Sequence, residues 1–335
     1  MAASSSSADV HDTPGGAARI GQGLNWFRYN LALIIPAIAI VITFSLLHPE
    51  FMGMRNIMNL LREMTIISIV AVGLTIVMAS GRFDMSFYGV GNFVVMTCGF
   101  LLYYYHLPVG LIILLGLGIG LGTGALCGLL VAKLRLPDIM ATIGVASVFA
   151  GFSYKYTEGV MLWLYAFPKL VWMGTGAVGP VKIPVFFLIG VVICVYLFMY
   201  RTKFGFRISA VGTSPDAATH TGISVVRYRW LAFILAGGLY GLAGLIFLGR
   251  FGKTNPLAFD PLMLPIIAAC FMGTAMFKGK ANVVGTLIGV FILSVLANGL
   301  TLLNIHWTRA DLYKPVIFLV ALVIAIYIRK RKIVG

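Results

Sequence analysis

Residues 107–131 read LPVGLIILLGLGIGLGTGALCGLLV, a stretch of 25 positions without one charged side chain. A helix needs about 20 apolar residues to cross the roughly 30 Å hydrocarbon core of a bilayer, so this stretch predicts a transmembrane helix. Glycine recurs in it at every fourth position, at Gly116, Gly120, Gly124 and Gly128. This spacing puts the four glycines on one helical face, where a neighbouring helix can approach closely. The pattern indicates tight helix packing and carries no chemistry.

The composition of the whole chain indicates the same environment. Of its 335 residues, 60% are hydrophobic and only 10% are charged, whereas a soluble domain carries about a quarter charged residues. Apolar runs long enough to span a bilayer recur from one end to the other. We therefore predict an all-α integral membrane protein, a polytopic helical bundle.

About ten transmembrane helices are expected, near residues 31–47, 65–79, 81–105, 107–131, 138–152, 184–200, 230–249, 262–277, 283–303 and 312–328. The first two are joined by a short amphipathic piece. The runs 81–105 and 138–183 are consistent with full spans or with discontinuous helices that meet inside the membrane. Residues 1–25 are rich in Ser, Ala and Gly and lack the features of a signal peptide, so they predict a disordered cytoplasmic tail before a membrane domain at 26–335.

The net charge of +15 would suggest a nucleic-acid partner in a soluble protein. Here the basic residues lie largely at the ends of apolar runs, and the positive-inside rule explains them without nucleic acid. The run Arg329–Lys332 places the C-terminus inside. An even number of spans then predicts that both termini are cytoplasmic.

The longest polar interruption of the second half is the loop 201–229, which contains the sequence GTSPDAATHTG at 212–222. Arginine and lysine flank it, so the loop is expected on the cytoplasmic side. Ser214 can cap a short helix, Pro215 suits its first turn, Asp216 favours its N-terminal end and Gly222 suits its stop. Such a helix could dock a soluble partner, or it could be an ordered loop without one.

A few polar residues inside the apolar runs could carry chemistry. Asp84 would be costly near the bilayer centre, so it predicts a pairing or a wet path, with Arg82 as the obvious partner; an interfacial turn is the alternative. Asn92 and Asn298 could bond a hydroxylated solute or could join helices. The cysteines lie alone at Cys98, Cys127, Cys194 and Cys270, and no Cys/His cluster exists, so no metal is assigned. Gly252-Lys253-Thr254 lacks the first glycine of a phosphate-binding loop, so no nucleotide site is expected.

Several motifs resemble a known family. The loop carries T-x-F-G at 202–205, A-V-G at 210–212, Ala217-Ala218 and Gly222-Ile223. Gly81, Asp84 and Ser86 are similar to a G-G-I-D-L-S signature, with Arg82, Phe87 and Tyr88 as departures. Gly273-Thr274, Lys280, 284–289 and 298–300 resemble a second signature. Together they resemble the permease subunits of bacterial ATP-binding-cassette importers, in the branch that includes the ribose permease.

The resemblance implies a transport subunit, not an enzyme, that moves a small hydroxylated solute such as a sugar across the bacterial inner membrane. It implies an ATPase subunit that uses the ATP, a second permease chain, an external solute-binding protein and no cofactor on this chain. Coupling is expected at Gly212, Pro215, Asp216, Ala217, Ala218 and Gly222, and the pathway or its gate at Asp84, Ser86, Asn92 and Asn298.

Other functions stay open at this point. The solute of such a permease could be an amino acid or a nucleoside. An ion-driven carrier would need intramembrane carboxylates, for which Asp84 is the candidate. An intramembrane enzyme would need a nucleophile, a base or a metal cluster, and the sequence shows none.

Overall fold

The computed structural model describes residues 38–277 and 279–303, together with 316, 319, 320 and 323. The predicted tail at 1–25, most of the last span at 312–328 and the run Arg329–Lys332 lie outside the described residues. The cytoplasmic placement of both termini therefore stays a prediction.

The described chain is helical apart from one small hairpin. Its helices are Ile38–Leu47, η1 (Pro49–Met52), α2 (Met54–Ala79), α3 (Phe87–Tyr105), α4 (Val109–Gly128), η2 (Leu129–Lys133), α5 (Asp138–Thr157), α6 (Pro168–Thr175), α7 (Ile183–Arg201), α8 (Lys203–Thr213), α9 (Pro215–His220), α10 (Val225–Phe251), η3 (Asp260–Leu262), α11 (Met263–Met276) and α12 (Val283–Leu302). Strands β1 (Ala177–Val178) and β2 (Val181–Lys182) pair antiparallel.

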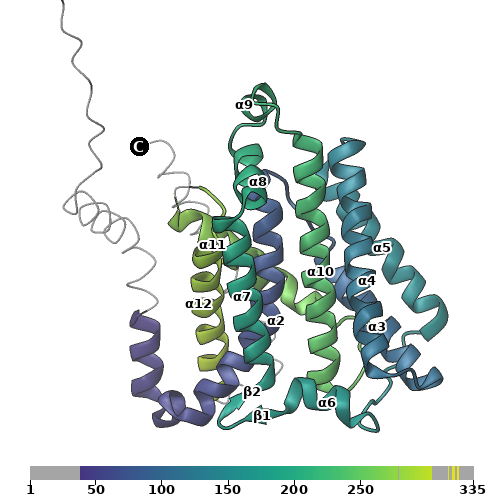
Figure 1. The fold of residues 1–335 in the computed structure, drawn as a ribbon. Coiled ribbons are helices and arrows are strands. Elements are labelled where there is room, and N and C mark those ends of the chain that lie inside the picture. Colours follow the sequence, from purple (N-terminus) through teal and green to yellow (C-terminus); the bar gives the residue numbers. More distant parts are fainter. Residues whose placement is uncertain (1–37, 278, 304–315, 317–318, 321–322, 324–335) are drawn as a thin grey trace, which may run out of the picture.

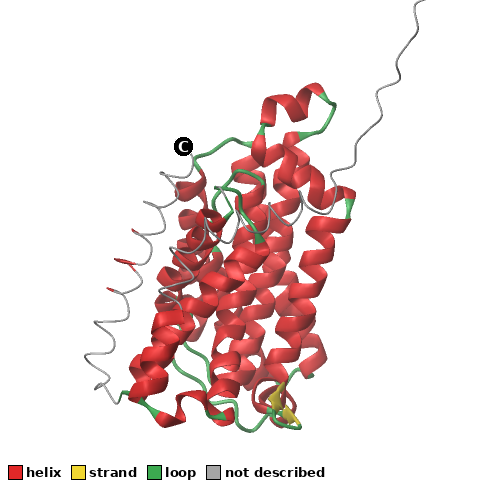
Figure 2. Ribbon diagram, turned by 90° about the vertical axis from the view of Figure 1, so that its left-hand side faces the viewer, coloured by secondary structure: helices red, strands yellow, loops and turns green. Residues whose placement is uncertain are grey.

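Six of the described helices are long and apolar enough to cross a membrane: α2, α3, α4 with η2, α7, α10 and α12. They run along the long axis of the bundle, with α8 and α9 at one end and the β1–β2 hairpin with α6 at the other (Figures 1 and 2). We call these the α9 end and the hairpin end. Helix α2 is the central element, because it packs against α7, α10, α11 and α12 and is buried almost continuously from Met64 to Val77.

Helices α4 and α10 pack against each other over a long face, and the glycine stripe explains it. A Cβ added at Gly120 would lie 2.3 Å from the carbonyl oxygen of Gly237, and one at Gly124 would lie 2.3 Å from that of Phe233. A Cβ at Gly241 would lie 2.5 Å from the carbonyl oxygen of Gly116. The backbones therefore touch without side chains between them, and the predicted close approach along this face is confirmed.

One expectation about the first half needs correction. Helix α2 begins at Met54, so the amphipathic piece before residue 65 belongs to the same helix. No proline interrupts residues 54–79, so the helix passes through residue 65 without a break. The span expected near residues 81–105 is α3, which starts at Phe87 and is preceded by an irregular segment, Gly81–Ser86, that turns back into the bundle.

The depth of that turn follows from its neighbours on α10. The carbonyl oxygen of Ser80 accepts a hydrogen bond from Nε of Arg229 at 3.4 Å. The ring of Phe87 packs on Tyr240, with centroids 6.1 Å apart. Arg229 and Tyr240 are eleven residues apart, which is about 16 Å along a helix axis. The segment thus descends well into the bundle, where irregular backbone is tolerated because protein surrounds it.

Candidate functional site

The α9 end carries a short capped helix, as the sequence predicts. The hydroxyl of Ser214 accepts from the backbone N–H of Ala217 at 3.4 Å, and Pro215 occupies the first turn of α9. Gly222 ends the turn with φ of +75°, a backbone conformation that residues other than glycine rarely adopt. The predicted start, cap and stop of this helix are confirmed.

The predicted coupling residues divide between two faces. Asp216, Ala217 and Gly222 are exposed beyond the end of the bundle, whereas Ala218 is buried on the inner face of α9. Pro215 is half-buried. Gly212 faces inward: a Cβ there would lie 2.0 Å from the carbonyl oxygen of Ala79. Three of the six predicted coupling residues are thus exposed, and the other three are buried or half-buried.

A groove of about 460 Å³ runs between α8 and α9. Phe206, Ser209 and Thr213 line its α8 side, and Ala217 and Thr221 line its α9 side. Phe206 is 76% exposed, which is unusual for a phenylalanine on a helix that packs well on its other face. The sequence analysis did not select Phe206. The available signal was an aromatic residue on the polar loop, next to the T-x-F-G motif.

The residues under the groove are well packed. Ile208, Val211 and Ala218 pack with Met199 of α7 and Tyr228 of α10 in a separate apolar cluster. Nη1 of Arg207 also donates to the hydroxyl of Tyr228 at 2.7 Å. Helices α8 and α9 are therefore packed onto α7 and α10.

The second group of predicted residues centres on Asp84, which is fully buried. Its Oδ1 accepts from the backbone N–H of Ser86 at 2.7 Å, just before α3. The expected pairing with Arg82 is wrong, because Nη1 of Arg82 lies 2.9 Å from Oδ1 of Asp138 on α5. The Arg82 side chain stays 28% exposed in this position. Pairing with the buried Asp84 would remove the guanidinium group from water, which is unfavourable for a charged group.

Asp84 and Ser86 lie together with Tyr240 of α10. The Tyr240 hydroxyl lies beside the Asp84 carboxylate. The Ser86 hydroxyl also lies against this carboxylate, and all three side chains are buried. Buried polar groups are normally hydrogen-bonded, so the three side chains form a small polar cluster inside the bundle.

Asn92 and Asn298 lie apart from this group and join other elements. Nδ2 of Asn92 donates to Oδ1 of Asp260 at 2.6 Å, and its Oδ1 accepts from the backbone of Phe259 at 2.8 Å. Asn298 of α12 bonds to Asn56 of α2. Both side chains are buried, so in this conformation they join helices.

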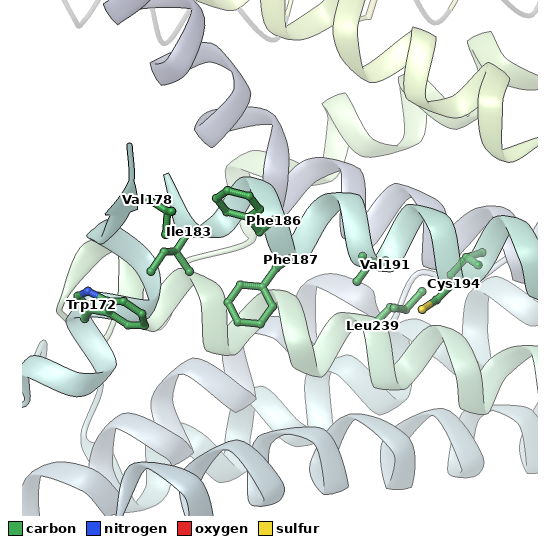
Figure 3. Close-up of a pocket in the computed structure, with 10 residues that line it drawn as sticks. Trp172, Val178, Ile183, Phe186, Phe187, Val191, Cys194 and Leu239 are labelled. Atoms are coloured by element: carbon green, nitrogen blue, oxygen red, sulfur yellow. The ribbon is translucent and has the colours of Figure 1, made fainter. Parts of the chain in front are cut away.

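An apolar groove of about 580 Å³ follows α7 from Trp172 at the hairpin end to Cys194 (Figure 3). Phe186, Phe187 and Leu239 contribute to its wall. A sugar needs hydrogen-bond partners for its hydroxyl groups, and this lining offers almost none. The groove is therefore not a sugar site. Among the described residues, no cluster of three or more His, Cys, Asp or Glu could hold a metal ion.

The comparisons with known proteins agree with the helical, membrane-spanning architecture. Residues 56–326 match the family described as branched-chain amino acid transport system / permease component. The ribose import permease of Bacillus subtilis is 32% identical over 307 residues, which cover 88% of this chain and 90% of that protein. A probable ABC transporter permease of Escherichia coli is 33% identical over 90% of this chain and 91% of its own length.

A more distant relative also matches most of this chain. The xylose/arabinose import permease of Sulfolobus acidocaldarius is 27% identical over 90% of this chain and 86% of that protein. No solved structure matches the chain. The family match covers most of the chain, and the ribose permease exceeds 30% identity over nearly its whole length. This chain therefore belongs to the family of permease subunits of ATP-binding-cassette transport systems.

Proposed function

We propose that this chain is the membrane subunit of a sugar importer and that a separate ATPase subunit drives it by docking on α8 and α9. The observation that carries the proposal is the exposed face of α9. Helix α9 projects beyond the end of the bundle (Figure 1). A groove lined by the exposed Phe206 runs beside it. A surface of this shape can receive a partner without being reorganised.

The charge distribution supports the orientation. Arg201, Lys203, Arg207, Arg227 and Lys133 all belong to the α9 end. By the positive-inside rule this end faces the cytoplasm, where the ATPase subunit is found. The hairpin end then faces outward, toward a solute-binding protein. We propose about ten spans in total, both termini inside, and the bacterial inner membrane as the location.

The relatives that import ribose, xylose and arabinose support a sugar as the solute. The family description names branched-chain amino acids, so an amino acid is the second candidate. A second permease chain completes the pathway in this proposal, and the ATP is used by the partner subunit. This chain contributes the helices, the docking surface and no cofactor. Asp84, Ser86, Asn92 and Asn298 act as the framework of the pathway or its gate.

Reconstitution tests the solute class. The chain would be placed in proteoliposomes with the ATPase subunit and the solute-binding protein encoded beside it. Uptake of radiolabelled ribose, xylose, arabinose and leucine would be measured with and without internal ATP. ATP-dependent uptake of a pentose supports the proposal. ATP-dependent uptake of leucine alone would replace the sugar with an amino acid, and ATP-independent uptake driven by an ion gradient would contradict it.

A further inference from the structure

We propose that the irregular segment Gly81–Ser86 transmits movement of α8 and α9 to α5 and to the N-terminal end of α3, deep inside the bundle. This inference rests on the proposed function, because it assumes that an ATPase subunit moves α8 and α9. It adds a route by which that movement reaches the helices between the two ends.

The first step is the contact between α8 and the segment. A Cβ added at Gly212 would lie 2.0 Å from the carbonyl oxygen of Ala79 and 2.8 Å from the backbone nitrogen of Gly81. A Cβ added at Gly81 would lie 3.1 Å from Cα of Gly212. No side chain separates the two backbones, so α8 cannot move toward α2 without displacing residues 79–81.

The second step is the attachment of the segment to α5. Asp138, at the first turn of α5, accepts from Nη1 of Arg82 at 2.9 Å and from the backbone N–H of Phe83 at 3.0 Å. One turn further along α5, the hydroxyl of Thr142 accepts from the backbone N–H of Met85 at 3.0 Å. Two backbone donors of the segment are thus held by α5 side chains, and the segment and the start of α5 move together.

The third step is the lower end of the segment. Asp84 and Ser86 lie beside Tyr240 of α10, and the three polar side chains are buried together. Movement of the segment against α10 therefore has to change the hydrogen bonding among these three side chains.

The free face of α5 makes this movement useful. Met140, Ile143, Phe152 and Tyr154 are exposed along α5, and no atom lies within 4 Å of a Cβ added at Gly144 or Gly151. Within the described chain, α5 packs mainly through α3. Within this chain α5 is held on one side by the segment and α3, so it can change its position without disturbing the core around α2.

A labelling experiment that needs no knowledge of the solute tests the inference. Met85→Cys would be introduced together with Cys194→Ser, since Cys194 is the exposed cysteine of the described residues. The complex with the ATPase subunit would be treated with a maleimide in two states, nucleotide-free and trapped with ATP and vanadate. The labelling rate of Met85→Cys is expected to differ at least fivefold between the states.

Two sets of variants connect this response to the route. Thr142→Val removes the acceptor for Met85 and is expected to reduce the rate difference to below twofold, whereas Thr142→Ser keeps the hydroxyl and the response. Gly212→Ala is expected to reduce it as well, with Gly190→Ala on α7 as control, because a Cβ at Gly190 meets no atom within 4 Å. If Gly212→Ala does not fold, the comparison of Thr142→Val with Thr142→Ser tests the route by itself.

The outcomes separate the inference from the proposed function. Equal labelling of Met85→Cys in both states, while the ATPase is bound, would overturn the inference and leave the proposed function intact. A full response in both Thr142→Val and Gly212→Ala would also overturn it. If the wild-type chain does not capture the ATPase subunit at all, both fail together.

Discussion

Asn56 and Asn298 exchange two side-chain hydrogen bonds across the bundle. Nδ2 of Asn56 donates to Oδ1 of Asn298 at 2.9 Å, and Nδ2 of Asn298 donates to Oδ1 of Asn56 at 3.1 Å. The pair joins α2 to α12, and the two residues are 242 positions apart in sequence. Asn56 also donates to the carbonyl oxygen of Phe51 at 2.9 Å, so its amide is fully used.

Asn298→Ala is expected to lower the free energy of unfolding by about 1–3 kcal/mol, because it leaves the amide of the part-buried Asn56 partly unpaired. Thermal unfolding in detergent would measure it, with the exposed Thr301→Ala on the same helix as control. Asn56→Leu combined with Asn298→Leu should cost less than the sum of the two single changes. Strict additivity would show that the two amides do not interact.

Asp138 should matter more than its ionic partner Arg82. Asp138→Ala removes acceptors for both Arg82 and the backbone of Phe83, so we expect a loss of about 2–3 kcal/mol. Arg82→Gln removes one partner of a part-exposed pair and should cost about 1 kcal/mol or less. Denaturant unfolding of both variants would compare them. Equal losses would mean that the ion pair, and not the backbone bond, holds the segment.

Gly120→Ala and Gly118→Ala form a matched pair on α4. The Cβ at position 120 would meet the carbonyl oxygen of Gly237 at 2.3 Å, so this change should destabilise by about 1–3 kcal/mol. The Cβ at position 118 meets nothing within 4 Å, and the better helix propensity of alanine should leave stability unchanged or slightly higher. The melting temperatures of the two variants decide it; a similar fall in both would contradict the close packing of α4 on α10.

Phe206→Ala should weaken capture of the ATPase subunit by at least about tenfold, because large aromatic side chains in a groove commonly dominate an interface. The chain itself should unfold as the wild type does, since Phe206 is 76% exposed. Phe152→Ala on α5, also an exposed phenylalanine, is the control and should bind normally. Binding isotherms in detergent would measure both. Normal affinity in Phe206→Ala would place the interface elsewhere on the α9 end.

Much of the fold could be predicted from hydrophobic patterning alone. The length of apolar runs located α4, α7, α11 and α12 to within a few residues, and Ser214 with Gly222 located α9. These signals are local: a span needs only length and hydrophobicity, and a short helix needs only a cap and a stop.

The missed features depend on contacts between distant residues. Arg82 pairs with Asp138 and not with its neighbour Asp84, because the chain between them descends into the bundle. The path of residues 81–86 depends on contacts with α5 and α10, so the sequence left a full span and discontinuous helices open as alternatives. Helix α8 was not predicted, although Thr202 caps it through the backbone N–H of Gly205 at 3.2 Å; the T-x-F-G motif held that signal.

The central claim is that the exposed face of α9 docks the ATPase subunit, and one measurement tests it directly. The chain, solubilised in mild detergent, would be used to capture the ATPase subunit encoded beside it. The double variant Asp216→Arg with Ala217→Glu would be compared with wild type, and Phe152→Ala would again serve as control. Capture by wild type and control, with loss in the double variant, is the predicted result. Equal capture by all three, or none by wild type, would contradict the account.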